Sequence, residues 1–211
     1  MKIYENITPA LQEIRRSHGN GYTNWVSFVA DKERATGIKD KWSEAYGTLL
    51  PAWKRNDRKN KNLPLAVSYA SPVLSRPGKL EVILLAWLPD SLPPVWQKEN
   101  WRRDLPVFSE FVLVKEPNAT RNYVWTWKLQ DQTLGGLEKH LIALVKSGDA
   151  GAVRHETEHM VRLYPLFSGV RRQIRRLFRS AAKLWLATSK SPWPGPDPEN
   201  LPAMVGFRKC G

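Results

Sequence analysis

The stretch from residue 160 to residue 196 contains eight Lys and Arg residues and no Asp or Glu. Within it, apolar residues recur at the spacing of one helix face, at Val170, Ile174, Leu177, Ala181 and Leu184. This spacing predicts a helix over residues 170–188. The apolar face of such a helix has to pack against a core, whereas the remaining face presents concentrated charge to the surroundings.

The basic side chains of this predicted helix gather on the face opposite the apolar one. They are Arg171, Arg172, Arg175, Arg176, Arg179 and Lys183. Like charges repel each other unless an anion opposes them, so the pattern predicts a binding surface. Nucleic acid is the preferred ligand, contacted through its phosphates with little base discrimination. An acidic protein surface and anionic lipid are the alternatives, in that order.

The positive charge is unevenly distributed along the chain. The formal net charge is +13, and residues 1–159 contribute +5 of it while residues 160–196 contribute +8. A second basic stretch, Lys54–Lys61, is polar throughout and predicts an exposed loop. Its cations are a second candidate contact patch, formed by Lys54, Arg55, Arg58 and Lys59.

Hydrophobic periodicity predicts an α+β fold. Segments rich in Val, Ile, Tyr and Trp predict four strands, over residues 65–70, 80–88, 108–114 and 122–129. The last two form a hairpin around residues 116–120. Helical patterns precede them at residues 8–18 and, as two helices, at residues 23–50; they follow at residues 134–146, 149–164 and 170–188. We therefore expect an antiparallel sheet of about four strands, with N-terminal helices and a C-terminal three-helix segment.

Length and composition favour a single α+β domain over residues 1–190, in which residues 134–188 are the helical C-terminal part. Residues 191–211 are predicted to form an extended tail because of Pro192, Pro194, Pro196 and Pro198. The single cysteine, Cys210, allows no internal disulfide, and the longest apolar run, Val82–Leu88, is too short to span a bilayer. We expect a cytoplasmic protein without a transmembrane segment.

The segment His155-Glu156-Thr157-Glu158-His159 resembles the H-E-x-x-H motif of zinc metalloproteases over five residues. The resemblance implies zinc held by His155 and His159, with Glu156 activating a water molecule. A third protein ligand is missing nearby, because only His140 and His18 remain upstream and no histidine follows. We therefore prefer a charged helix face, in which Glu158 pairs with Arg154 and Arg162 one turn away on either side, and we expect no cofactor.

The chain contains ten tryptophans, several of them close to Lys or Arg in the sequence. Tryptophans of this kind can stack on the bases of single-stranded nucleic acid. The alternation of Trp125 and Trp127 with polar neighbours instead favours burial in the core. Only an exposed tryptophan would support base stacking.

The sequence contains no Walker A loop, no GxGxxG and no GxSxG, so enzymatic activity is the minority hypothesis. We expect a non-enzymatic accessory or regulatory protein that binds nucleic acid electrostatically, for example in DNA processing or the transfer of a mobile element. The first alternative is a protein-binding inhibitor of a macromolecular machine, such as the one that transfers a plasmid. The second is a zinc-dependent hydrolase of the H-E-x-x-H type.

Overall fold

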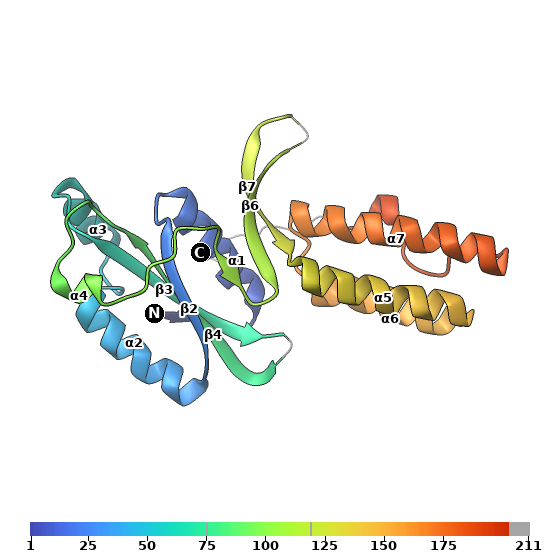
Figure 1. Ribbon diagram of the computed structural model, residues 1–211, viewed down its shortest axis with the longest axis horizontal. Coiled ribbons are helices and arrows are strands. Elements are labelled where there is room, and N and C mark those ends of the chain that lie inside the picture. Colours follow the sequence, from blue (N-terminus) through green and yellow to red (C-terminus); the bar gives the residue numbers. More distant parts are fainter. Residues whose placement is uncertain (75, 119, 203–211) are drawn as a thin grey trace. The chain divides into compact units, whose positions relative to one another are not determined.

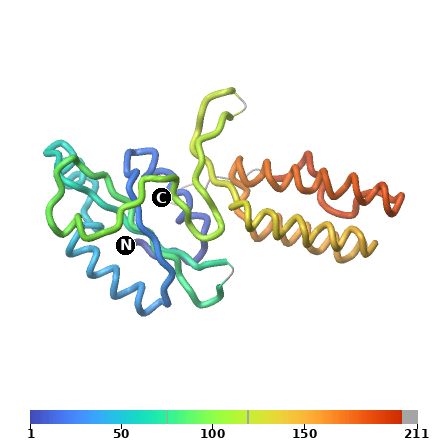
Figure 2. Tube along the Cα trace, viewed as in Figure 1, coloured from blue at the N-terminus to red at the C-terminus, as the bar shows by residue number. Residues whose placement is uncertain are grey.

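The computed structural model describes residues 1–74, 76–118 and 120–202 (Figures 1 and 2). The chain divides into two compact units, with the boundary after Ser109. We describe them separately as the N-terminal unit and the C-terminal unit, and the single domain over residues 1–190 stays a prediction. Within the described ranges, no helix has the length and apolar character that crossing a membrane requires.

The N-terminal unit is built on a mixed four-stranded sheet with the order β1-β3-β4-β2. Its strands are β1 (Lys2–Ile3), β2 (Asn24–Asp31), β3 (Leu65–Val73) and β4 (Arg76–Trp87). β1 runs parallel to β3, whereas the other neighbours are antiparallel. Residues 82–86 of β4 are fully buried, because this central strand is covered on both faces. The strands predicted over residues 65–70 and 80–88 are confirmed.

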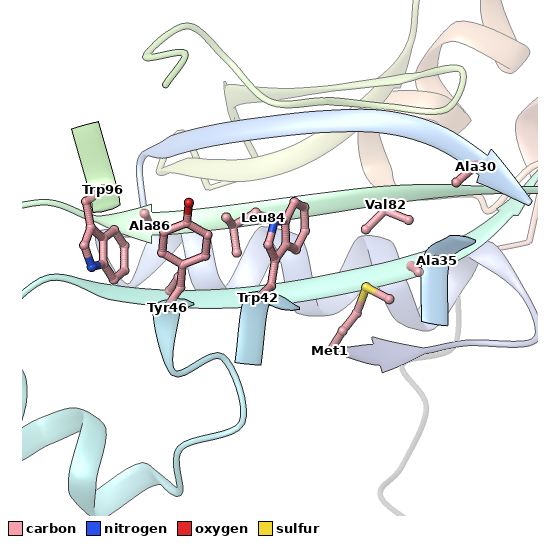
Figure 3. Close-up of a cluster of buried hydrophobic side chains, with 11 residues drawn as sticks. Met1, Ala30, Ala35, Trp42, Tyr46, Val82, Leu84, Ala86 and Trp96 are labelled. Atoms are coloured by element: carbon pink, nitrogen blue, oxygen red, sulfur yellow. The ribbon is translucent and has the colours of Figure 1, made fainter. Parts of the chain in front are cut away.

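One face of this sheet packs against α2 (Lys32–Tyr46) and the short α4 (Pro94–Gln97). Trp42 of α2 lies near Leu84 of β4 and Tyr46 lies near Ala86, with Trp96 beside Tyr46 (Figure 3). The rings of Tyr46 and Trp96 meet edge to face, with centroids 4.8 Å apart. These large side chains belong to the core on this face and bury large apolar surfaces there.

The opposite face of the sheet carries α1 (Ile7–Gly19). Ala10, Leu11 and Ile14 are completely buried, at the spacing that the sequence predicted for this helix. The hydroxyls of Ser17 in α1 and Tyr69 in β3 are 2.7 Å apart, which fixes the helix end to the strand. Side chains alternate along a strand, so Tyr69 points away from the face that α2 covers.

Two predictions for the N-terminal unit are wrong. Residues 24–31, predicted to be helical, form β2, which pairs along its whole length with β4. Trp25, Phe28 and Val29 fit helical spacing, but pairing with a buried strand overrides so weak a local signal. The predicted loop Lys54–Lys61 falls mostly in α3 (Ala52–Asn60). None of the residues of α3 is buried, and its sequence accordingly shows no apolar periodicity. The segment is helical nevertheless, because Lys and Arg are good helix formers.

The C-terminal unit contains the hairpin of β6 (Phe111–Pro117) and β7 (Tyr123–Leu129). β5 (Val107–Phe108) is a two-residue strand that ends just before the boundary between the units. The strand predicted over residues 108–114 is therefore divided, and Ser109 between its parts has a positive φ of 55°.

Three helices follow the hairpin: α5 (Asp131–Ser147), α6 (Ala150–Leu163) and α7 (Ser168–Ser189). Figure 1 shows them packed along one another. They confirm the predicted C-terminal three-helix segment, and with the two sheets they confirm the α+β class.

The start of α7 is fixed to β7 by hydrogen bonds. The backbone N–H of Gly169 donates to the Thr126 hydroxyl at 3.1 Å. The Gln173 side chain accepts from the backbone N–H of Leu129 at 2.8 Å and donates to its carbonyl at 3.1 Å. The backbones of α7 and β7 approach so closely that a Cβ on Gly169 would lie 2.4 Å from the Trp127 carbonyl oxygen.

Residues 192–202 of the predicted tail pack against α6 and α7. The ring of Trp193 lies beside that of Phe178, with centroids 6.5 Å apart, and Leu201 is buried. A Cβ on Gly195 would lie 2.7 Å from the Thr157 hydroxyl in α6. A single 3-10 turn, η1 (Pro198–Asn200), follows. Residues 203–211, including Cys210, lie outside the described residues.

We predict that Gly169→Ala destabilises the protein by about 1–3 kcal/mol, because the new methyl group has to displace strand backbone. Gly136→Ala in α5 is the matched control, since a Cβ there meets nothing within 4 Å. Alanine is the better helix former, so this control should be neutral or stabilising by up to about 1 kcal/mol. Urea unfolding measures both changes. A Gly169→Ala protein as stable as the wild type would contradict the close packing of α7 on β7.

Candidate nucleic-acid interface

The six cations of α7 share one side of the helix. At about 100° per residue, Arg171, Arg172, Arg175, Arg176, Arg179 and Lys183 fall within an arc of about 140°. The opposite side consists of the buried residues Val170, Ile174, Leu177, Phe178, Ala181 and Trp185. We call the cationic side the basic face of α7. Charge is concentrated on it because the apolar stripe needs the other side for packing.

Arg172 contacts the end of β6. Its Nη1 lies 3.4 Å from the Glu116 carboxylate, and its Nη2 donates to the Pro117 carbonyl at 3.4 Å. Lys128 of β7 forms a second ion pair with Glu116. The carboxylate therefore serves two cations, and its side chain is 16% exposed. Arg172 is held at one edge of the basic face by this network.

Arg175 and Arg179 contact the 3-10 turn η1. Arg175 donates from Nε to the Pro198 carbonyl at 3.0 Å and from Nη2 to the Glu199 carbonyl at 3.2 Å. Arg179 donates from Nε and Nη2 to the two carboxylate oxygens of Glu199, at 2.5 and 2.6 Å. This is the bidentate arrangement that guanidinium also forms with phosphate. Part of the basic face is therefore covered by the chain's own tail.

The Arg179–Glu199 contact depends on pH in a defined direction. Hydrogen bonds from Arg179 lower the pKa of the Glu199 carboxyl below its ordinary value. A carboxyl with a lowered pKa stabilises the folded contact above the ordinary pKa of glutamate. That contribution is lost as the pH falls through the lowered value. Both side chains are more than half exposed, so solvent screens the pair.

The other three cations of the basic face have no partner in the described part of the chain. The side chains of Arg171, Arg176 and Lys183 make no hydrogen bond or ion pair with residues 1–74, 76–118 or 120–202. Arg176 and Lys183 are exposed, and they lie two helical turns apart. Leu186, 61% exposed, lies on the same side. These cations are available to an external anion without breaking an internal contact.

The four cations of the second predicted patch lie on α3 and not on a loop. Lys54 is exposed, with its Nζ 5.2 Å from the centroid of the Trp53 ring. Arg55 and Lys59, one turn apart, line a cavity of the N-terminal unit. Arg58 is half-buried. Trp53 is 68% exposed, so it is a tryptophan of the exposed kind that base stacking requires.

Other tryptophans near basic residues pack inward. Trp42, Trp96 and Trp127 are buried, and Trp101 and Trp125 are half-buried. Trp127 confirms the core position expected from strand alternation.

The H-E-x-x-H segment lies on α6. His155 and His159 are exposed, and their rings stack with centroids 6.5 Å apart. Glu156 instead approaches His140 of α5, with 3.8 Å between Oε2 and Nε2. His18 is buried in α1 of the N-terminal unit. Over the described ranges, no group of three or more His, Cys, Asp or Glu residues is arranged to hold a metal ion.

The charged-face alternative also differs from the structure. Glu158 is exposed and forms no ion pair with Arg154 or Arg162 among the described residues. Arg154 donates from Nε to the Pro194 carbonyl at 3.1 Å, because the tail passes beside α6. Residues one turn apart on an exposed helix can form an ion pair, but such a pair stabilises the helix so little that its formation cannot be predicted from the spacing alone.

Sequence reasoning did not identify Glu116 and Glu199 as partners of the basic face. Neither lies within α7: Glu199 is 20 residues from Arg179, and Glu116 belongs to the hairpin. The helix itself contains no acidic residue, so its sequence carries no signal for these contacts. They arise from the tertiary fold, through the close packing of α7 on β7 and the return of the tail.

Comparisons with known proteins leave the function to be argued from the structure. No family model matches the chain, and neither a curated protein nor a solved structure matches it.

Proposed function

We propose that the chain is a non-enzymatic accessory protein that binds nucleic acid through the basic face of α7. The observation that carries this proposal is the gathering of six cations within an arc of about 140° on a helix without acidic residues. From Arg171 to Lys183 the face extends about 18 Å along the helix axis. Duplex DNA carries one charge per about 1.7 Å of its axis, so several phosphates lie within this length.

The contacts within the chain support a phosphate-like ligand. Glu199 presents two oxygens to Arg179, and Arg175 meets two backbone carbonyls. The basic face therefore already coordinates oxygen acceptors in geometries that phosphate oxygens can take over. Binding of this kind attaches the protein to the backbone of the nucleic acid and carries little base specificity. DNA processing or the transfer of a mobile element, such as a plasmid, is the context we propose for it.

One observation favours an acidic protein surface as the second candidate ligand. Leu186 is 61% exposed on the cationic side, and an exposed leucine among cations has no role in phosphate contact. A protein partner with an acidic rim could cover such a residue. In this alternative the chain acts as an inhibitor of a macromolecular machine, such as a plasmid-transfer apparatus. We do not carry the zinc hydrolase into the proposal, because Glu156 faces His140 and three ligands do not converge among the described residues.

We predict that removing the three unpartnered cations reduces the salt dependence of nucleic-acid binding. The triple variant Arg171→Ala/Arg176→Ala/Lys183→Ala breaks no described contact, so the fold should be retained. If each side chain neutralises one phosphate, the slope of log K against log salt should become shallower by about 2–3 for a duplex. Fluorescence anisotropy with a labelled duplex at several salt concentrations measures this slope.

The control for that experiment is Lys139→Ala/Lys146→Ala, two exposed cations of α5. It removes charge from the same unit and should change the slope less than the triple variant does. Equal slopes for wild type and triple variant would exclude the basic face as the nucleic-acid site. Loss of partner capture in Leu186→Ser, insensitive to nuclease treatment, would support the protein-directed alternative instead.

We further predict that Glu199→Gln increases affinity for nucleic acid. The substitution removes the anion that competes for Arg179, so this cation becomes available and the salt slope should steepen by up to about 1. Glu158→Gln is the matched control. It makes the same charge change at an exposed position of α6, where the carboxylate has no ion-pair partner among the described residues. At neutral pH, Glu199→Gln should bind nucleic acid more tightly than Glu158→Gln does. An effect of equal size in both would attribute the gain to net charge and not to uncovering of Arg179.

A further inference from the structure

The N-terminal unit contains a cavity of about 760 Å³ that is partly open to solvent. Its walls come from α1, from residues 48–50 and α3, and from the edge of β3, all within one unit. The volume lies in the range of about 300–1,000 Å³ that small-molecule sites occupy. Leu65, Val67 and Tyr69 alternate along β3 and form an apolar floor on the sheet face that carries α1.

The lining of the cavity is strongly cationic. Lys2, Arg16, Arg55 and Lys59 contribute four positive charges, and Glu13 contributes the one carboxylate of the lining. Glu13 lies 3.7 Å from Arg16, so these two partly neutralise each other. The positive excess is therefore supplied by Lys2, Arg55 and Lys59. Low-dielectric walls focus such a field and attract anions.

Arg55 and Lys59 are held in place by backbone carbonyls and not by acids. Arg55 donates from Nη1 to the Leu50 carbonyl at 2.9 Å. Lys59 lies with its Nζ 3.5 Å from the Asn20 carbonyl. A neutral carbonyl orients a cation without cancelling its charge, so both side chains keep donors for a ligand. The contact of Arg55 also orders the segment that connects α2 to α3.

Buried hydroxyl groups complete the lining. Thr48 is 6% exposed, and its Oγ1 has no hydrogen-bond partner in the described chain. Burying a hydroxyl without a hydrogen-bond partner costs free energy, and a bound ligand that accepts a hydrogen bond from it removes that cost. Ser17 and Tyr69 share one hydrogen between their oxygens, which leaves the second hydroxyl hydrogen free to donate. Burial raises the pKa of Tyr69 to about 12, so this phenol keeps its proton at neutral pH.

From this lining we infer that the cavity binds a small phosphorylated molecule of mononucleotide size. Guanidinium and ammonium groups beside hydroxyl donors match the several oxygens and the charge of a phosphate group. The apolar floor and the Tyr22 side chain offer a surface for a ring system. The inference is independent of the basic face of α7, because every lining residue belongs to the N-terminal unit.

Isothermal titration calorimetry of the full chain tests this inference, with ATP, AMP, pyrophosphate, inorganic phosphate and adenosine as probes. We expect the phosphorylated probes to bind and adenosine not to bind. Tighter binding of AMP than of both inorganic phosphate and pyrophosphate would support a ligand of mononucleotide size, whereas pyrophosphate binding at least as tightly as AMP would contradict a contact with the ring system. Absence of binding by every probe at about 1 mM would overturn the inference.

The variant Arg55→Gln/Lys59→Gln should weaken binding of the phosphorylated probes at least about tenfold, since it removes two charged donors. Lys54→Gln/Lys61→Gln is the matched control, because it removes two cations of the same segment that do not line the cavity. If both double variants weakened probe binding equally, the effect would come from the net charge of the segment, and this would contradict a site in the cavity. The α7 variant Arg171→Ala/Arg176→Ala/Lys183→Ala should still bind these probes. Loss of probe binding in this variant would mean that the probes bind to α7 and not in the cavity.

Thr48→Val separates a ligand contact from a structural role. The substitution keeps the size of the side chain and removes the unpartnered hydroxyl, so the melting temperature of the free protein should stay constant or rise. Affinity for the phosphorylated probes should fall about three- to tenfold, the effect of one lost neutral hydrogen bond. A lower melting temperature with unchanged affinity would mean that the hydroxyl serves the fold and contacts no ligand.

Discussion

The contact between Gln173 and the backbone of Leu129 determines how the C-terminal unit presents its charge. Both groups of the amide side chain are used, one as acceptor and one as donor, so α7 can neither rotate nor slide on β7 without losing two hydrogen bonds. Gly169 provides the close approach that makes the contact possible. With the helix fixed in this way, its buried stripe lies against the unit and its cations lie on the remaining side.

The two units concentrate positive charge by different means. In α7, the sequence places cations on one side of a helix, and the fold then supplies carboxylates to some of them. In the N-terminal unit, cations from α3, α1 and the first strand converge on a cavity although they are far apart in the sequence. The first arrangement suits a long polyanion that lies on a surface, and the second suits a small anion that enters a pocket.

Sequence patterns predicted the elements that carry strong periodicity. The three C-terminal helices, α1 and the hairpin were recognised because their apolar spacing reflects one buried face, and β4 was recognised because its continuous apolar run reflects burial on both faces. β2 was mistaken for a helix because Trp25, Phe28 and Val29 fit helical spacing and not strict strand alternation, and only the pairing with β4 makes the segment a strand. α3 was mistaken for a loop because it buries nothing. The cations of α7 were identified from sequence, but their partners and the cavity depend on contacts between distant segments, which no local pattern encodes.

The carboxylate of Glu199 acts on Arg179 as a competitor attached to the same molecule. Dilution separates two free molecules but not two parts of one chain, so the competitor keeps a constant effective concentration at the guanidinium. An external anion therefore has to exceed a threshold that the length and stiffness of the connecting segment set, whatever the amount of protein present. If nucleic acid binds the basic face as we propose, its attachment at Arg176 and Lys183 would raise the local concentration of phosphate beside Arg179, where it competes with the carboxylate.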